Sequence, residues 1–132
     1  MALLVPDVGD VEMLTRVLNK GATGDVKLHL YTNNYTPVAG STVANFTECA
    51  AAGYAAITLA GASWAISTSA GTTTASYAAQ TFNLTASAVI YGYFVTNAAG
   101  TIVLWAELFT SAPFNIPSGG GSVQVTPKIT LK

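Results

Sequence analysis

His29 is the single histidine of the chain, and histidine is the side chain best suited to proton transfer near neutral pH. As the general base of a hydrolase it would need a hydroxyl or thiol nucleophile and a carboxylate that orients the ring. The six acidic residues follow no pattern that would place one beside it. We therefore expect His29 to lie on the polar face of a strand. A small hydrolase that uses His29 and an acid is the least favoured of three functional hypotheses.

The carboxylates suggest two other kinds of chemistry. Asp7, Asp10 and Glu12 lie close together, but their spacing is not that of a calcium-binding loop, and acids are favoured at helix starts in any case. Glu48 and Glu107 would form a catalytic pair only if the fold brought them together, which the sequence does not indicate. The sequence therefore predicts no enzyme, no metal site and no cofactor.

Charge is scarce in this chain. Hydrophobic residues make up 51% and charged residues 8%, whereas about 25% charged is typical of globular proteins. The formal net charge of −1 argues against binding to nucleic acid or to a membrane surface, and no charged residue occurs from Cys49 to Ala106. Cys49 is the single cysteine, so no internal disulfide can form. The first residues lack the basic region of a secretory signal, so we expect synthesis in a reducing cytoplasm.

The first element expected is a short amphipathic helix at residues 8–20. Val11, Leu14 and Leu18 recur there at helical spacing, and Gly21 follows where a helix-terminating glycine belongs. We expect a single domain over 1–132, with residues 1–24 as an N-terminal arm and residues 25–132 as its body.

After this arm, apolar residues recur at every second position. Residues 26–32 alternate apolar and polar side chains, which predicts a half-buried strand. Pro127 predicts an edge strand or a bulge. About seven to eight short strands with Gly-, Ser- and Thr-rich linkers favour an antiparallel β-sandwich or jelly roll. The other strands are expected at 53–60, 63–68, 76–84, 88–96, 101–109 and 122–132.

Residues 91–109 predict a hairpin in which both faces are apolar. If 97–100 form the loop, Phe94 lies opposite Val103, Tyr93 opposite Leu104, and Gly92 opposite Trp105, whose indole covers the glycine. A partner sheet would cover one face, and either the helix or other subunits would cover the second. The expected core and interface anchors are Tyr91, Tyr93, Trp105, Phe109 and Trp64, with Val11, Leu14 and Leu18 of the helix as a second docking surface.

Several longer stretches resemble a known family. They are "LLVPDVGDVEML", "LHLYTNNYTP", "FTECAAAGYAAITLAGASW", "QTFNLTASAVIYGYFVTNAAGTIVLWAELF" and "VQVTPKITL". Over essentially the whole chain they are similar to small virion proteins of tailed phages. The resemblance implies a virion component with a β-rich fold similar to capsid decoration, or cement, proteins, and it supplies no catalytic residues.

From these observations we expect a structural protein that binds the outer capsid surface and stabilises the shell. Its partners would be the major capsid protein and other copies of itself, with a trimer preferred over a dimer as the homo-oligomer. The expected location is the virion, assembled in the host cytoplasm. The alternative is a head- or tail-fibre module that binds host surface glycans.

Overall fold

The computed structural model describes residues 14, 15, 17, 18 and 24–131. This part of the chain is mainly β, with eleven strands whose pairings are all antiparallel and two short 3-10 turns, η1 (Val43–Asn45) and η2 (Gly61–Ser63). The strands are β1 (Val26–Tyr31), β2 (Ile57–Leu59), β3 (Ala65–Ser69), β4 (Thr72–Ser76), β5 (Gln80–Leu84), β6 (Ala88–Ile90), β7 (Gly92–Asn97), β8 (Val103–Leu108), β9 (Phe114–Ile116), β10 (Gly121–Val125) and β11 (Lys128–Leu131).

The strand count exceeds the seven to eight expected. The predicted strands at 88–96 and 122–132 are each divided in two, and neither β4 nor β9 was predicted. At Tyr91 the chain passes from β6, which pairs with β9, to β7, which pairs with β1. One continuous apolar run therefore serves two sheets.

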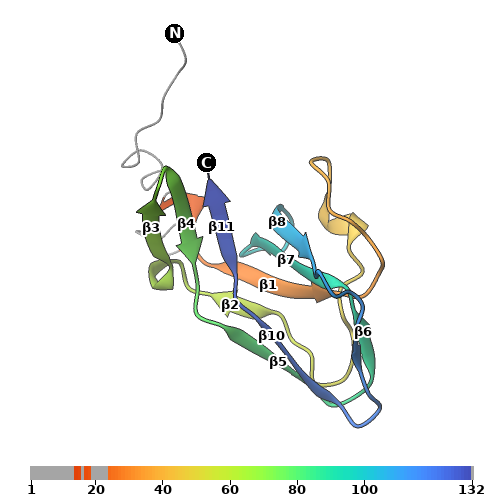
Figure 1. The fold of residues 1–132 in the computed structure, drawn as a ribbon. Coiled ribbons are helices and arrows are strands. Elements are labelled where there is room, and N and C mark those ends of the chain that lie inside the picture. Colours follow the sequence, from red (N-terminus) through yellow and green to blue (C-terminus); the bar gives the residue numbers. More distant parts are fainter. Residues whose placement is uncertain (1–13, 16, 19–23, 132) are drawn as a thin grey trace.

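The largest sheet has four strands in the order β2-β1-β7-β8 (Figure 1). β1 pairs with β7 along its whole length, from Val26 opposite Asn97 to Tyr31 opposite Gly92. Because side chains alternate along a strand, Leu28 and Leu30 lie on one face of the sheet, and both are fully buried. We call this face the inner face and the opposite one the outer face.

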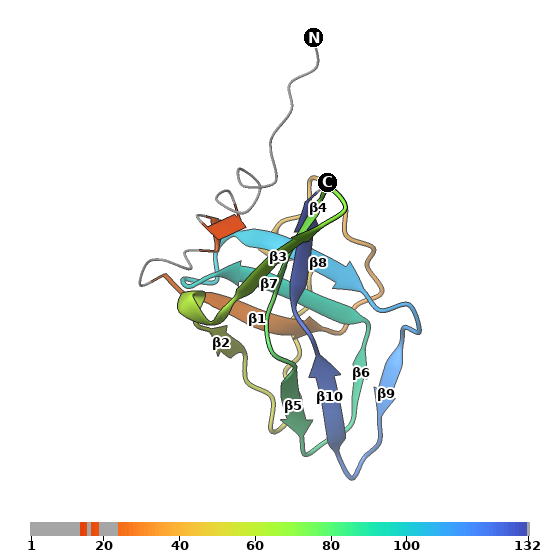
Figure 2. The ribbon, with the colours of Figure 1, turned by 60° about the vertical axis from the view of Figure 1, so that its left-hand side comes forward.

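β4 leads into β5 and β10 leads into β11, and the two pairs form one interrupted ribbon (Figures 1 and 2). Ser76 lies opposite Lys128 in one half, and Gln80 lies opposite Val125 in the other. Between the halves the Tyr77 N–H donates to the Pro127 carbonyl oxygen at 2.9 Å. Proline has no N–H to donate, which agrees with the irregularity predicted there.

The main core joins the inner face of the large sheet to this ribbon. Trp64 is its largest fully buried side chain, and it packs edge-on against Tyr77 and Trp105. Its other buried members are Leu14, Leu18, Val26, Leu28, Leu30, Cys49, Leu59, Ala75, Phe82, Leu84, Ile90, Tyr93, Val95, Ile116, Val123 and Val125.

Four residues of the predicted helix at 8–20 are described. The Leu18 N–H donates to the Leu14 carbonyl oxygen at 3.0 Å, a helical hydrogen bond. Leu14 and Leu18 are buried in the main core, so these two side chains do not form the expected docking surface; Val17 is 54% exposed. Val11 and the other helix residues lie outside the described part.

The β7–β8 pairing corrects the predicted register. Phe94 lies opposite Ala106 and Tyr93 opposite Glu107, three positions beyond the predicted partners, and the register shifts by one between Val95 and Thr96. The Asn97 side-chain oxygen accepts the backbone N–H groups of residues 101 and 102, which stabilises a longer turn than the one expected.

The space beside Gly92 is also filled by a different side chain from the one predicted. A Cβ atom built on Gly92 would lie 2.6 Å from the Tyr31 hydroxyl and 2.1 Å from the Glu107 carbonyl oxygen. Gly92 is therefore covered by the Tyr31 ring, and the Trp105 indole lies with the main core on the inner face.

The outer face of the hairpin is covered by residues 32–50, which we call the covering segment. Tyr31, Phe46 and Phe94 form a second buried cluster, in which the Phe46 and Phe94 rings stack with centroids 4.8 Å apart. The half-buried residues packed against it are Tyr35, Tyr91, Val103, Ala106 and Leu108. β1 is thus enclosed on both faces rather than half-buried, and no second subunit is required to cover the hairpin.

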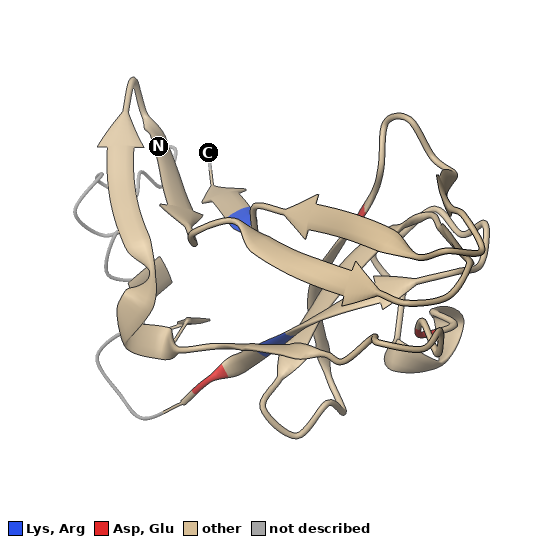
Figure 3. Ribbon diagram, turned by 90° about the horizontal axis from the view of Figure 1, so that it is seen from below, with Lys and Arg blue, Asp and Glu red and all other residues tan. Residues whose placement is uncertain are grey.

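Charged residues are few along the described part of the chain (Figure 3). The charged residues of the described part are Asp25, Lys27, Glu48, Glu107 and Lys128. β8 and β3 lie at the edges of their sheets, and together they carry a single charge, that of Glu107.

Candidate functional site

His29 lies at the centre of a polar network on the outer face of the large sheet. Its Nδ1 atom is 2.8 Å from Glu48 Oε1, and its Nε2 atom is 2.9 Å from Thr96 Oγ1. The Tyr54 hydroxyl donates to the same Glu48 oxygen at 2.8 Å. Burial, followed by the hydrogen bond to Glu48, raises the pKa of Tyr54 far above its ordinary value.

His29 lies in β1 on the face that carries Lys27 and Tyr31, as expected, but this face is covered: His29 is 6% exposed and stacks on Phe94 with ring centroids 4.6 Å apart. Glu48 of the covering segment lies within hydrogen-bond distance of the His29 ring. A carboxylate partner makes the burial of an imidazole tolerable.

The network has the carboxylate, imidazole and hydroxyl of a hydrolytic triad but not the access that one needs. Thr96 is 0% exposed, and its hydroxyl also lies 3.0 Å from the Asn97 carbonyl oxygen. A nucleophile must reach the substrate carbon, and this hydroxyl is enclosed. The arrangement is that of a hydrogen-bonded network, buried at His29 and Thr96 and exposed at Glu48, that fixes the covering segment to the sheet.

Glu48 and Glu107 do not form a carboxylate pair. Glu48 contacts His29 on the outer face of the large sheet. Glu107 lies opposite Tyr93, and its Oε2 atom accepts the Tyr93 hydroxyl at 2.9 Å on the inner side. The two acids thus serve different faces of the sheet.

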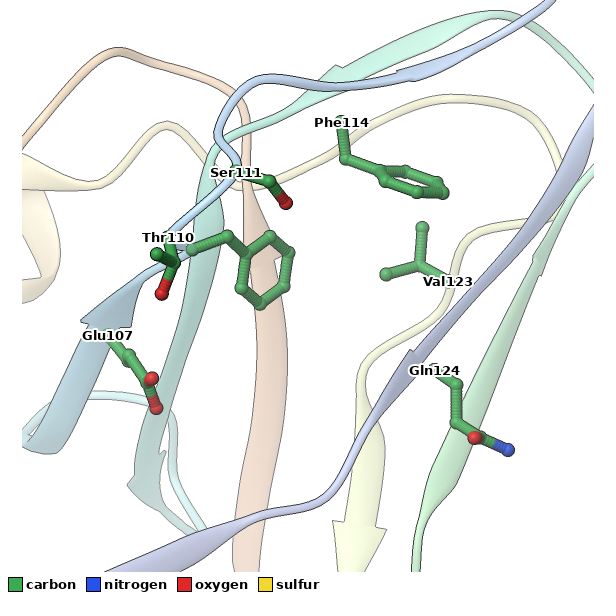
Figure 4. Close-up of a pocket in the computed structure, with 7 residues that line it drawn as sticks. Glu107, Thr110, Ser111, Phe114, Val123 and Gln124 are labelled. Atoms are coloured by element: carbon green, nitrogen blue, oxygen red, sulfur yellow. The ribbon is translucent and has the colours of Figure 1, made fainter.

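A pocket of about 340 Å³ opens where β8 leaves the large sheet (Figure 4). Glu107 and Thr110 lie on one side of the opening, Val123 and Gln124 lie on the other, and Phe114 closes one end. The lining residues are Glu107, Phe109, Thr110, Ser111, Phe114, Val123 and Gln124.

The pocket residues differ in exposure and in rigidity. Phe114 is 43% exposed, whereas Val123 is buried at 4%. Glu107 is held in place by the Tyr93 hydroxyl, and burial, followed by this hydrogen bond, raises the pKa of Tyr93 well above its usual range. The pocket therefore presents an oriented acceptor beside an exposed aromatic ring.

A second pocket, of about 260 Å³, is lined by residues of a different character. Its lining residues are Gly53, Ala55, Ala56, Ile57, Thr81, Phe82 and Asn83. The single aromatic ring there, Phe82, is buried in the main core and stacks on Tyr54. The Glu107 pocket is the better candidate site.

The predicted anchors at residues 64–109 belong to the two buried clusters or pack against them. Trp64 and Tyr93 are buried in the main core, and Trp105 and Phe109 are half-buried against it. Tyr91 is half-buried against the second cluster. Of these anchors, Phe109 is the one that lines the pocket; Phe114 and Gln124 were not singled out by sequence reasoning.

Neither a metal site nor a membrane-spanning helix is found among the described residues. No three His, Cys, Asp or Glu side chains there come together in a way that could hold a metal ion. No helix in the same part of the chain is long and apolar enough to cross a membrane.

The comparisons with known proteins give no relatives. The chain matches no protein-family model, and neither the curated proteins nor the solved structures contain a match. Its function must therefore be argued from its own residues.

Proposed function

We propose that this chain is a non-catalytic structural protein of a tailed-phage particle, and that it decorates the outer surface of the capsid. The sequence resemblance to small virion proteins supports this setting. The apolar hairpin does not, because the chain covers both of its faces itself.

The observation that carries the proposal is the scarcity of charge on strands that end the sheets of the described part. Natural proteins usually protect edge strands with charges or proline, because an unpaired strand edge can pair with another chain. β3 carries no charge and β8 carries only Glu107, and both lie at the edge of a sheet. Such edges suit strand addition to a neighbouring protein, and the neighbours we propose are the major capsid protein and further copies of this chain, arranged as a trimer.

We interpret the strand arrangement as a β-sandwich of the jelly-roll kind. The large sheet would form one layer, and the interrupted ribbon with β3 would form the other, with the main core between them. In this interpretation β8 and β3 are the outermost described strands of their sheets, and we propose that the capsid surface contacts them.

The mechanism would be thermodynamic. A ligand that binds only the assembled shell stabilises that shell by mass action. Each copy would contribute through buried apolar area at about 25 cal/mol per Å², and many copies would add their contributions.

Copy number in purified particles tests the proposal. We expect about one copy of the chain per major capsid subunit, by quantitative mass spectrometry of virions, and a lower thermal stability of particles from a phage that lacks the gene. Absence of the chain from virions would exclude the proposal.

The second candidate is a head- or tail-fibre module that binds glycans, and the Glu107 pocket is the observation in its favour. A fibre protein would be present at only a few copies per particle. The same copy-number measurement therefore separates the two candidates.

A further inference from the structure

We propose that the Glu107 pocket binds the ring of an uncharged carbohydrate. The pocket shares Glu107 with β8, one of the two edge strands invoked for capsid binding, but its other lining residues lie outside β8 and β3. The inference holds wherever on the particle the chain is located.

The apolar part of the lining consists of two phenylalanines and a buried valine. Phe114 exposes 43% of its surface, and Phe109 and Val123 also line the pocket. Phe114 keeps this exposure although its neighbour on β9, Ile116, is buried at 5%. A flat apolar ring that faces solvent at a pocket can stack against the C–H face of a sugar.

The polar part of the lining matches a ligand with many hydroxyl groups. Glu107 offers a carboxylate that the Tyr93 hydroxyl holds in position at 2.9 Å. Gln124, on the opposite side, brings an amide that both donates and accepts, and Thr110 and Ser111 add hydroxyl groups. A ring with hydroxyl groups around its edge can use donors and acceptors on both sides at once.

The charge of the lining residues favours an uncharged sugar over a charged one. Glu107 is the only charged residue among the described residues that line the pocket, and none of these is a Lys or Arg that could pair with a phosphate, sulfate or carboxylate. An acidic sugar would therefore be repelled. A quaternary amine could use Glu107 and the aromatic rings, but it would leave the amide and hydroxyl groups of the lining without partners.

The size of the pocket agrees with this class of ligand. Small-molecule sites usually measure about 300–1,000 Å³, and this pocket of about 340 Å³ lies at the lower end. It suits one sugar ring of a longer glycan better than an extended chain of rings.

The test is to screen the full chain on an array of neutral glycans, sialylated glycans and immobilised choline, and then to titrate the selected neutral oligosaccharide by calorimetry. We expect binding to neutral glycans alone. Phe114→Ala should weaken this binding by about tenfold or more, since it removes the stacking surface. Glu107→Gln should also weaken it, because hydrogen bonds to a charged acceptor are the stronger ones.

Two controls keep the result interpretable. Val38→Ala removes an exposed apolar side chain from the covering segment, where Val38 is 63% exposed, and should leave binding unchanged. Phe114→Tyr keeps an aromatic surface and should retain binding, and thermal unfolding should show that all variants are folded.

The proposal is overturned if no neutral glycan binds, if only sialylated glycans or choline bind, or if Phe114→Ala and Glu107→Gln bind as well as the parent chain. None of these outcomes bears on virion copy number, so the capsid proposal is tested independently.

Discussion

Gly92→Ala should destabilise the protein strongly, although it adds a single methyl group. The new Cβ atom would lie 2.1 Å from the Glu107 carbonyl oxygen and 2.6 and 2.7 Å from two atoms of the Tyr31 ring. Tyr31 is fully buried, and the Glu107 oxygen belongs to the backbone of the paired strand β8. Neither obstacle can move aside by rotating a flexible side chain.

The expected cost follows from this geometry. Adding a methyl group to a packed interior usually costs about 1–3 kcal/mol, and a contact to backbone at 2.1 Å requires β7 and β8 to separate. Alanine gains about 0.4–1 kcal/mol because it restricts the unfolded chain. Because the contact to backbone puts the cost at the upper end of its range, we expect a net loss of about 2 kcal/mol in the free energy of unfolding.

The assay is urea unfolding followed by tryptophan fluorescence, with the free energy taken from the midpoint at constant slope. Gly40→Ala is the matched control, because nothing lies within 4 Å of its Cβ position, and it should change stability by less than about 0.5 kcal/mol. If Gly92→Ala were as stable as Gly40→Ala, the placement of Tyr31 beside Gly92 would be wrong.

Three further predictions concern buried polar groups, and urea unfolding measures each of them. Thr96→Val leaves His29 Nε2 without its partner and should cost about 1–3 kcal/mol, whereas Thr130→Val, at an exposed threonine pair, should cost little; equal effects would contradict a structural role for the His29 network. Trp64→Ala should lower the free energy of unfolding by about 3–5 kcal/mol. Trp64→Phe should lower it far less, because the indole N–H has no acceptor among the described residues. Similar losses for the two variants would reveal a partner for that N–H. Burial raises the pKa of Tyr31 from 10.0 to about 12, so this phenol ionises in the unfolded chain before it ionises in the folded one. The urea midpoint should therefore decrease as the pH rises from 10 to 12. A midpoint that is constant over this range would refute the burial of the phenol.

Local patterns in the sequence predicted the strands better than their pairing. The alternation at 26–32 located β1, and Pro127 marked the break between β10 and β11. The hairpin register was wrong because it depends on loop length, and the Asn97 side chain stabilises a longer loop. An asparagine at the start of a turn was the available signal for this.

The environment of His29 could not be predicted from strand periodicity. That pattern identifies which residues share a face but not whether another segment covers the face. The covering segment has the composition of a loop, yet its Phe46 belongs to the second cluster and its Tyr35 packs against that cluster. Two aromatic residues in a turn-rich stretch were the signal that this segment folds back over the sheet.

The pocket could be predicted least of all. Its lining residues come from β8, the turn after it, β9 and β10, and they meet only because the chain returns to the same end of the molecule. Of its residues, sequence reasoning considered Glu107 as an acid and Phe109 as an anchor, and it gave no reason to bring them together with Phe114 and Gln124.

The scarcity of charge determines how any contact made by this body will respond to its surroundings. With five charged residues in the described part, a contact of the kind proposed would contain few or no ion pairs and would draw its free energy from apolar burial and hydrogen bonds. Ionic strength screens charge pairs but leaves these interactions largely intact, so the strength of such a contact should change little between low and high salt. Cooling is the change that should loosen it, because hydrophobic attraction weakens as temperature falls.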